Sequence, residues 1–139
     1  MTTHLIDTSV LIEWLRDTSS RATAELERLR DAAGDLALTQ PVVMEVLMGA
    51  PRGTELRTRR ALARFPLLDV DLSDFEVAAD LYRGAMQSGN TVRSSMDCVI
   101  AAVALRSGAV LVHRDRDFRR LAAIAPDLHC LDTLDEPVA

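Results

Sequence analysis

Residues 94–112 read SSMDCVIAAVALRSGAVLV, and this stretch determines the class of fold. Its first part predicts a helix that is apolar on most sides and therefore buried. Ser94 or Ser95 provides the N-terminal cap, and Gly108 ends the helix. Its last part, residues 109–112, is a short uninterrupted apolar run, as in a strand of a parallel sheet that is covered on both faces.

The rest of the chain repeats this alternation of strands and helices. Further strands are predicted at 4–6, 36–38, 67–70 and 129–131, and further helices at 8–15, 19–33, 41–49, 52–65, 73–87 and 118–124. We therefore predict a three-layer α/β/α sandwich with a short, mainly parallel central sheet. Ligands bind such sheets at the carboxyl ends of the strands, so the polar residues at those ends are the candidates for a site.

Length and composition set the broad class of protein. The 139 residues, 48% of them hydrophobic, fit one domain over residues 1–139. The amino terminus lacks the basic start and apolar run of a secretory signal, and no stretch approaches the roughly 18 apolar residues of a membrane span, so we expect a cytoplasmic protein. The net charge is −5, and no lysine is present. Because evenly spread negative charge would repel nucleic acid, an RNA-binding protein would need its acids gathered at a metal site and its arginines elsewhere.

Five acidic side chains occupy positions where a carboxylate needs an explanation. Asp7 ends the first predicted strand, and Asp115 and Asp117 follow the strand at 109–112. Asp97 lies in the first turn of the buried helix, and Glu45 lies inside an otherwise apolar helix. Each could be an ordinary helix cap, turn residue or ion-pair partner. Taken together, they come from four segments that could share one edge of a sheet.

Carboxylates that converge in this way have a specific chemistry. They repel one another and raise each other's pKa values, and a divalent cation removes that cost. A ligand set made only of oxygen atoms favours Mg²⁺ or Mn²⁺ over zinc. Such a site activates a water molecule and clamps the oxygens of a phosphodiester during its displacement.

Four motifs in a fixed order carry a family resemblance. They are LIDTSVL at 5–11, Glu45 in the helix after Pro41, DCVIAA at 97–102, and VHRDRDF at 112–118. Over essentially the whole chain these motifs resemble the PIN-domain ribonucleases, most closely the VapC toxins of bacterial toxin–antitoxin pairs. The resemblance implies a metal-dependent endoribonuclease toxin, with a cognate VapB-type antitoxin and a homodimeric state, in the bacterial cytoplasm.

The same resemblance implies roles for single residues. Asp7, Glu45, Asp97 and Asp115 would form the catalytic, metal-binding quartet. Asp117 would be a fifth acid at or near the metal, and Thr8 or Ser9 would hydrogen-bond a carboxylate or the scissile phosphate. His113 stands where the family often has Thr or Ser, so it either contacts RNA or only packs.

The arginines near the proposed site are candidates for substrate binding. Arg93 precedes the helix that carries Asp97, and Arg114 and Arg116 flank Asp115. Their guanidinium groups could hold phosphates through bidentate contacts. The arginines at 52–64 could extend this track, or those at 57–64 could form a solvated helix face.

An antitoxin peptide is expected in a groove between the early helices, where it would mask the acidic pocket. Trp14, Leu15 and the apolar residues at 43–47 either form that surface or belong to the core.

Two other classes of protein compete with the ribonuclease. A receiver-type domain needs a lysine near its site, and this chain has none; a haloacid-type phosphatase needs a second Asp where Ser9 stands. A non-catalytic binding module on the same fold would be expected to lack one or more of the acids. A DNA-specific nuclease would use the same chemistry, because only contacts to the 2′-hydroxyl select ribose.

Overall fold

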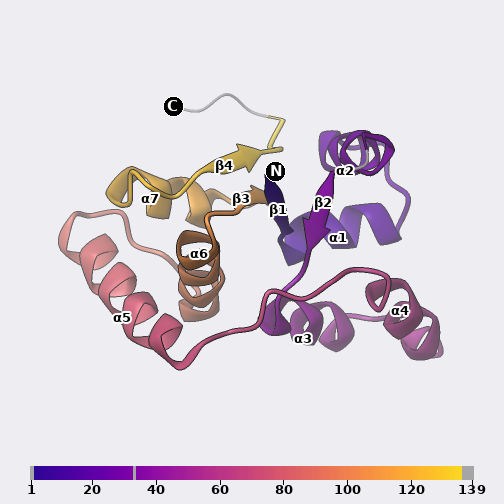
Figure 1. Cartoon of the computed structure of the whole chain (residues 1–139), viewed down its shortest axis with the longest axis horizontal. Coiled ribbons are helices and arrows are strands. Elements are labelled where there is room, and N and C mark those ends of the chain that lie inside the picture. Colours follow the sequence, from indigo (N-terminus) through magenta and orange to yellow (C-terminus); the bar gives the residue numbers. More distant parts are fainter. Residues whose placement is uncertain (1, 33, 136–139) are drawn as a thin grey trace.

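A computed structural model describes residues 2–32 and 34–135, which form a sheet flanked by helices (Figure 1). The elements, in chain order, are β1 (Thr3–Ile6), α1 (Thr8–Leu15), α2 (Arg21–Asp31), β2 (Asp35–Ala37), α3 (Gln40–Met48), α4 (Glu55–Leu62), α5 (Leu72–Gln87), α6 (Ser95–Ser107), β3 (Val110–His113), α7 (Arg116–Ile124) and β4 (Cys130–Asp132). Strands and helices alternate as predicted, except that four helices in succession separate β2 from β3.

The sheet brings distant parts of the chain together. Its strand order is β2-β1-β3-β4, and every neighbouring pair runs parallel. In β1, His4 lies opposite Leu36 of β2, and Leu5 lies opposite Leu111 of β3. Because all strands point the same way, β1 and β3 end side by side in the middle of one edge. The predicted α/β class with a parallel sheet is confirmed.

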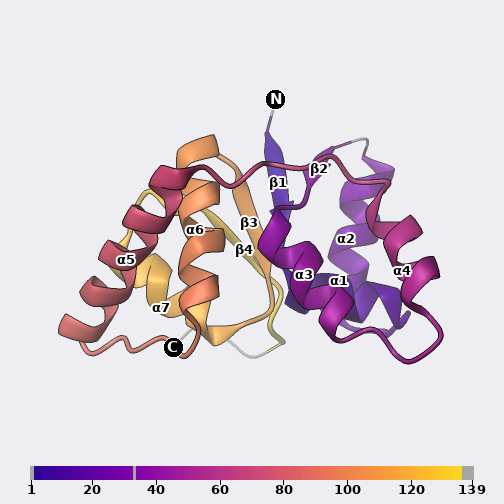
Figure 2. The same cartoon turned by 90° about the horizontal axis from the view of Figure 1, so that it is seen from below.

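The helices form two groups beside the sheet. In both views α5, α6 and α7 lie near β3 and β4, whereas α1 to α4 gather near β1 and β2 (Figures 1 and 2). Every residue from Asp97 to Ala104 of α6 is buried, as the apolar pattern of this helix predicts. Arg106 joins α6 to α5 by donating from Nε to the buried Asp74 at 3.0 Å. None of the helices in the described part of the chain is long and apolar enough to cross a membrane.

Two helices begin at the carboxyl end of the sheet with an aspartate as cap. The cap of α1 is Asp7, whose side chain accepts from the Ser9 N–H at 3.0 Å. The cap of α7 is Asp115, which accepts from the Asp117 N–H at 2.9 Å. An aspartate cap places a carboxylate where the strand ends and the helix dipole favours negative charge.

The strand predicted at 67–70 is wrong, since only Leu67 forms a bridge, to Leu38. Side chains form the hydrogen bonds with this backbone that a neighbouring strand would otherwise have formed. The Gln40 Oε1 accepts from the Val70 N–H at 3.0 Å, and Arg106 donates to the Asp69 carbonyl at 2.7 Å. Beyond the bridge to Leu38, the segment is therefore held by side chains of α3 and α6 and not by a neighbouring strand.

Candidate functional site

The ends of β1 and β3 place the first two acids of the site. Asp7 follows β1 directly, and its backbone N–H donates to the Val112 carbonyl of β3 at 2.9 Å. Asp115 follows β3 by two residues and caps α7. Since β1 and β3 are neighbours, the two carboxylates lie at the same edge of the sheet.

Two helices bring the remaining acids to this edge. Asp97 enters from the first turn of α6, and its carboxylate oxygen lies within 4.8 Å of those of Asp115 and Asp117. Glu45 enters from α3 and accepts from the Thr8 hydroxyl at 3.2 Å. The structure thus gathers all five acids that the sequence singled out.

Burial and mutual repulsion shift the pKa values of this cluster upward. Burial, followed by the charges of Asp7, Asp115 and Glu45, raises the pKa of Asp97 to about 8. Burial raises the pKa of Asp7 to about 6, although hydrogen bonds from Ser9 oppose the shift. Burial also raises the pKa of Glu45. Three carboxylates therefore hold protons more tightly than usual and lack a compensating positive charge.

An unpartnered buried oxygen shows that this cluster suits a cation. The Oδ2 of Asp7 accepts two hydrogen bonds from Ser9, but its buried Oδ1 has no hydrogen-bond partner. A buried carboxylate oxygen without a partner is strongly disfavoured. A divalent cation would satisfy this oxygen and offset the repulsion, and a donor set made only of carboxylates fits a hard cation.

Asp117 differs from the other acids, because the protein itself neutralises it. Its carboxylate accepts from the Arg93 N–H at 3.0 Å and from Arg120 Nη1 at 2.7 Å, and Arg93 Nε lies 3.6 Å away. These contacts anchor the loop before α6 to the start of α7. Arg120 was not identified from the sequence; its position three residues after Asp117 on one helix face was the available signal.

Two hydroxyl groups hold the acids in place. The Ser9 hydroxyl donates to Asp7 at 2.6 Å and accepts from the Arg114 N–H at 2.9 Å, so it ties the end of β1 to the end of β3. The Thr8 hydroxyl holds Glu45. The structure places both at carboxylates, and a contact of either with substrate stays a prediction.

The three candidate arginines differ in their surroundings. The guanidinium of Arg93 is 76% exposed and lies 3.5 Å from Asp115, so it stands at the rim of the acidic cluster. That of Arg114 donates to the Thr133 carbonyl and to Asp135, each at 2.8 Å, and is thus engaged by the C-terminal part of the chain. Arg116 is exposed at the first turn of α7. Substrate contacts of all three remain predictions.

His113 packs in the interior and holds the backbone of Asp115. Its ring is buried, lies 5.2 Å from the Phe118 ring, and accepts from the Asp115 N–H at its Nδ1. Burial lowers the pKa of His113 to about 4, so the ring is neutral and can accept this hydrogen bond at neutral pH. Of the two roles left open by the sequence, the structure shows packing.

The two central strands of this parallel α/β sheet end at a pocket of clustered carboxylates, an arrangement that suits a bound cation. The sequence profile of the PIN domain matches residues 4–124. This chain belongs to the PIN-domain family.

Curated relatives and solved structures agree with this assignment. The chain is 46% identical over 123 residues to ribonuclease VapC11 of Mycobacterium tuberculosis, covering 86% of this chain and 92% of that protein. It is 33% identical to ribonuclease VapC51 of the same organism, over 87% and 86% of the two chains. A chain of the toxin–antitoxin complex VapBC-5 of M. tuberculosis matches with a TM-score of 0.69 and 25% identity over 95% and 99% of the two chains. One of VapBC2 from Rickettsia felis, at 18% identity over 94% and 98%, shares the fold with a TM-score of 0.74.

Proposed function

We propose that this protein is a metal-dependent endoribonuclease toxin that a VapB-type antitoxin neutralises. The observation that carries the proposal is the acidic cluster with its unpartnered Asp7 oxygen and the raised pKa values of Asp7 and Asp97. The relatives named ribonuclease VapC11 and VapC51 supply the substrate class, since they align over most of this chain.

Four acids would hold the metal ion, which we infer to be Mg²⁺ or Mn²⁺. They are Asp7, Glu45, Asp97 and Asp115, with Asp117 at the border of the site. When bound, the ion supplies an activated water and stabilises charge on the phosphodiester oxygens. The chain's own contribution is to fix the ligands: Ser9 orients Asp7 and Thr8 orients Glu45 through the hydrogen bonds described above.

The test compares cleavage of RNA and DNA of one sequence. Purified protein is incubated with each strand in chelator, in Mg²⁺ and in Mn²⁺, and the ends of the products are mapped. We expect cleavage of RNA only with metal, at internal positions. Cleavage in chelator, or of DNA as fast as of RNA, would contradict the proposal.

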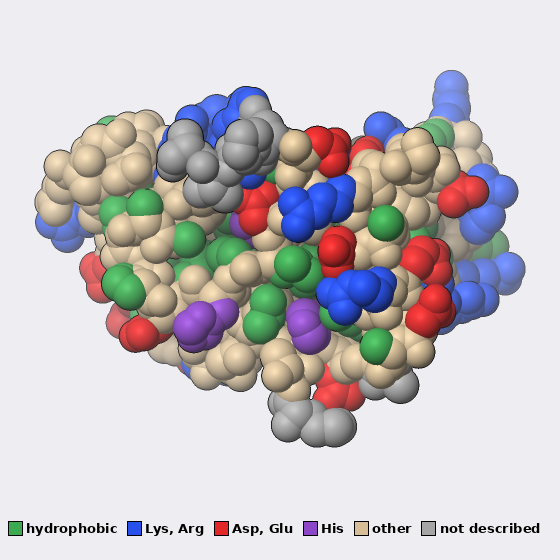
Figure 3. All heavy atoms as spheres, turned by 90° about the horizontal axis from the view of Figure 1, so that it is seen from above, with side chains coloured by type: hydrophobic (Ala, Val, Ile, Leu, Met, Phe, Trp, Pro, Cys, Tyr) green, Lys and Arg blue, Asp and Glu red, His purple; other side chains and the backbone are tan. Residues whose placement is uncertain are grey.

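RNA binding by an acidic protein needs positive charge near the site. On the face shown in Figure 3, arginine and acidic side chains alternate and do not gather in one basic patch. Arg93 is the arginine best placed to meet a phosphate, because its exposed guanidinium stands at the rim of the acidic cluster. We propose that it binds the phosphate next to the scissile bond.

Replacing Arg93 with alanine is expected to weaken RNA binding and to flatten its salt dependence. The slope of log K against log salt should fall by roughly 0.7, the value for one phosphate contact on single-stranded RNA. Binding is titrated across a salt series in the Asp97→Asn background, so that the RNA stays whole. Arg28→Ala, a change of equal charge at an exposed position of α2, is the control. An unchanged slope in Arg93→Ala would move the RNA track to residues 57–64.

The antitoxin is proposed to bind the face formed by α1, α3 and α4. These helices expose large apolar side chains, namely Leu15, Met44, Met48 and Leu56. Leu15 lines a hollow of about 230 Å³ between these helices, while Trp14 turns toward Phe65. An exposed apolar surface of this kind is typical of protein–protein contacts. We expect both partners in the bacterial cytoplasm.

A homodimer is proposed to form through α5. This helix exposes Leu72, Phe75, Tyr82 and Met86. We expect that Phe75→Asp shifts the protein from dimer to monomer in sedimentation velocity, because a charge in an apolar contact is costly. Leu56→Asp on α4 is the control and should leave the dimer intact. A wild-type monomer, or a dimer that survives the Phe75 substitution, would contradict the proposed interface.

A further inference from the structure

One end of the acidic cluster already carries positive charge from the protein itself. The side chain of Asp117 is buried, and its Oδ1 accepts from Arg120 Nη1 at 2.7 Å and lies 3.6 Å from Arg93 Nε. Arg93 also reaches Asp115, because its Nη2 lies 3.5 Å from Oδ1 of that residue. Two guanidinium groups therefore stand at the end of the cluster formed by Asp115 and Asp117, and neither group loses its charge at neutral pH.

The opposite end of the cluster has no such compensation. Among the described residues, no arginine forms an ion pair with Asp7, Glu45 or Asp97. The Oδ1 of Asp7 is buried and has no hydrogen-bond partner. Of the acids whose charges act on Asp97, Asp7 has the largest effect and Asp117 the smallest. A divalent cation is therefore stabilised most between Asp7 and Asp97, away from the two guanidinium groups.

A second divalent ion would have to share the other end with these arginines. The ligand geometry alone would admit it, since one carboxylate oxygen each of Asp97, Asp115 and Asp117 lie within 4.8 Å of one another. An ion bound to Asp117, however, would lie close to the guanidinium of Arg120. Like charges at such short range in a largely buried site repel one another strongly. The arginines, and not the carboxylates, therefore limit the number of ions.

We propose that Arg120 takes the place of a second metal ion and limits the acidic cluster to one divalent ion per chain. Arg120 acts as a positioning residue, because it holds the carboxylate of Asp117 and leaves the ion to the other four acids. Arg93 supports this arrangement from the loop before α6. The inference rests on the metal-dependent function proposed above and specifies how many ions that function uses.

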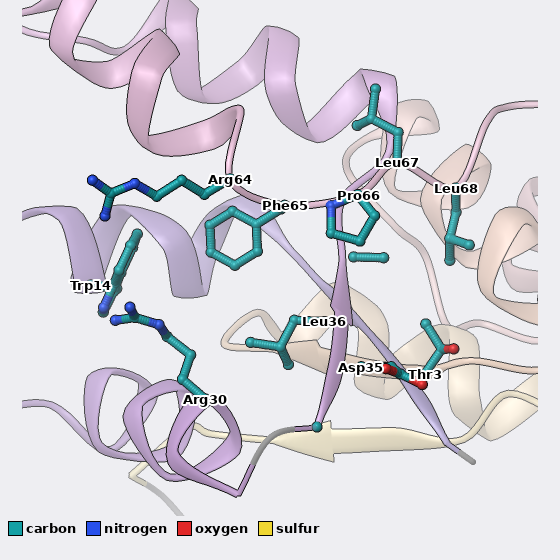
Figure 4. A pocket seen from close by; sticks show the side chains of 12 residues that line it. Thr3, Trp14, Arg30, Asp35, Leu36, Arg64, Phe65, Pro66, Leu67 and Leu68 are labelled. Carbon is teal, nitrogen blue, oxygen red and sulfur yellow. The ribbon is translucent and has the colours of Figure 1, made fainter.

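A pocket of about 540 Å³ beside β2 offers no competing metal site (Figure 4). Asp35 is the one acid in its lining, whereas Arg30 and Arg64 contribute two guanidinium groups. Within the ranges that the structure describes, no group of three potential ligand side chains lies as close together as the one in the acidic cluster. A count of bound ions therefore reports on that cluster.

Electron paramagnetic resonance counts bound Mn²⁺ directly, because free hydrated Mn²⁺ gives a sharp signal that weakens on binding. We expect one bound ion per chain in the wild type and two in Arg120→Met, since Asp117 then lacks the charge that repels a second ion. Arg120→Lys keeps this charge and should restore the count to one. Arg60→Met removes an exposed arginine of α4 and is the control of equal charge, for which we expect one ion.

A double variant tests whether Asp117 holds the second ion. Adding Asp117→Asn to Arg120→Met removes that carboxylate and should return the count to one. The melting temperature provides a second readout. Saturating Mn²⁺ should raise it more in Arg120→Met than in the wild type, because each bound ion stabilises the folded state. Circular dichroism confirms that the variants are folded, and the count for the wild type tests the inference independently of them.

The outcomes separate this inference from the proposed function. Two ions bound to the wild type, or a single ion bound to folded Arg120→Met, would overturn the inference and leave a metal-dependent nuclease in place. Absence of bound Mn²⁺ in the wild type would overturn both. A second ion in Arg60→Met as well would show that the overall charge of the protein, and not Arg120, sets the number of ions.

Discussion

Replacement of Asp97 with asparagine is expected to reduce RNA cleavage by roughly 10²–10⁴-fold, because loss of a metal ligand removes several kcal/mol of transition-state stabilisation. Asp97 is the carboxylate on which the charges of all four other acids act, so its loss disturbs the cluster most. Asp7→Asn should have a comparable effect, since it removes the unpartnered buried oxygen. Initial cleavage rates in saturating Mn²⁺ provide the measurement.

Asp127→Asn is the matched control for these variants. Asp127 is an exposed acid in the turn before β4, so the change in charge is the same without a change in the cluster. We expect wild-type cleavage from this variant. Full activity in Asp97→Asn, under conditions where chelator stops the wild type, would show that Asp97 is not a ligand.

The second large effect concerns stability: in the metal-free protein, Asn substitutions at two buried aspartates are expected to change the free energy of unfolding in opposite directions. Asp97→Asn should stabilise the fold by about 2 kcal/mol at pH 8, because it removes a carboxylate whose ionisation is opposed by burial and then by the neighbouring acids. Asp117→Asn should destabilise it by about 1.5 kcal/mol, because it weakens the charge-assisted hydrogen bonds that the buried carboxylate accepts from Arg120 and the Arg93 N–H. Melting temperatures should move in opposite directions, by roughly 2–4 °C per kcal/mol.

The pH dependence of the Asp97→Asn effect follows from the direction of the pKa shift. The pKa of Asp97 is raised from 3.8 to about 8 on folding, so the folded state binds a proton that the unfolded state has lost between these values. This residue therefore costs the wild type stability as pH rises from about 4 to about 8. The variant is free of this loss, so the difference in melting temperature should grow over that range and level off above it.

Added Mn²⁺ provides an internal check on the same proteins. It should raise the melting temperature of the wild type more than that of Asp97→Asn, since a ligand stabilises the state that binds it. Equal shifts would mean that no metal site includes Asp97. Destabilisation by both aspartate substitutions would instead show that Asp97, like Asp117, is neutralised within the protein.

The sequence predicts the architecture well where apolar residues alone determine it. The buried helix α6 and the strand β3 follow from uninterrupted apolar runs, and the edge shared by Asp7 and Asp115 follows from parallel strands. The prediction of a strand at 67–70 was wrong because side chains, and not a neighbouring strand, form the hydrogen bonds with the backbone of Asp69 and Val70. The Gln40 amide and the Arg106 guanidinium reach this segment only in the folded protein, and no local pattern records them.

The role of each residue in the site was harder to predict than the set of residues that form the site. An acid is neutralised where the side chain of a nearby arginine points toward it. Arg120 neutralises Asp117 in this way, whereas the charges that act on Asp97 are those of other acids. The engagement of Arg114 depends on Thr133 and Asp135, which follow β4 and lie far along the sequence. The burial of His113 likewise depends on the packing of Phe118 against it.

The order of the strands has a consequence for synthesis of the protein. Among the described strands, β1 comes before the others in the chain and lies between β2 and β3, and β3 begins only at Val110. A nascent chain that ends before Val110 lacks both this neighbour and Asp115, so one side of β1 stays open and the acidic cluster is incomplete. Pairing over such a separation forms late in folding. Ribosome-bound intermediates and prematurely terminated chains are therefore expected to be harmless to the cell that makes them.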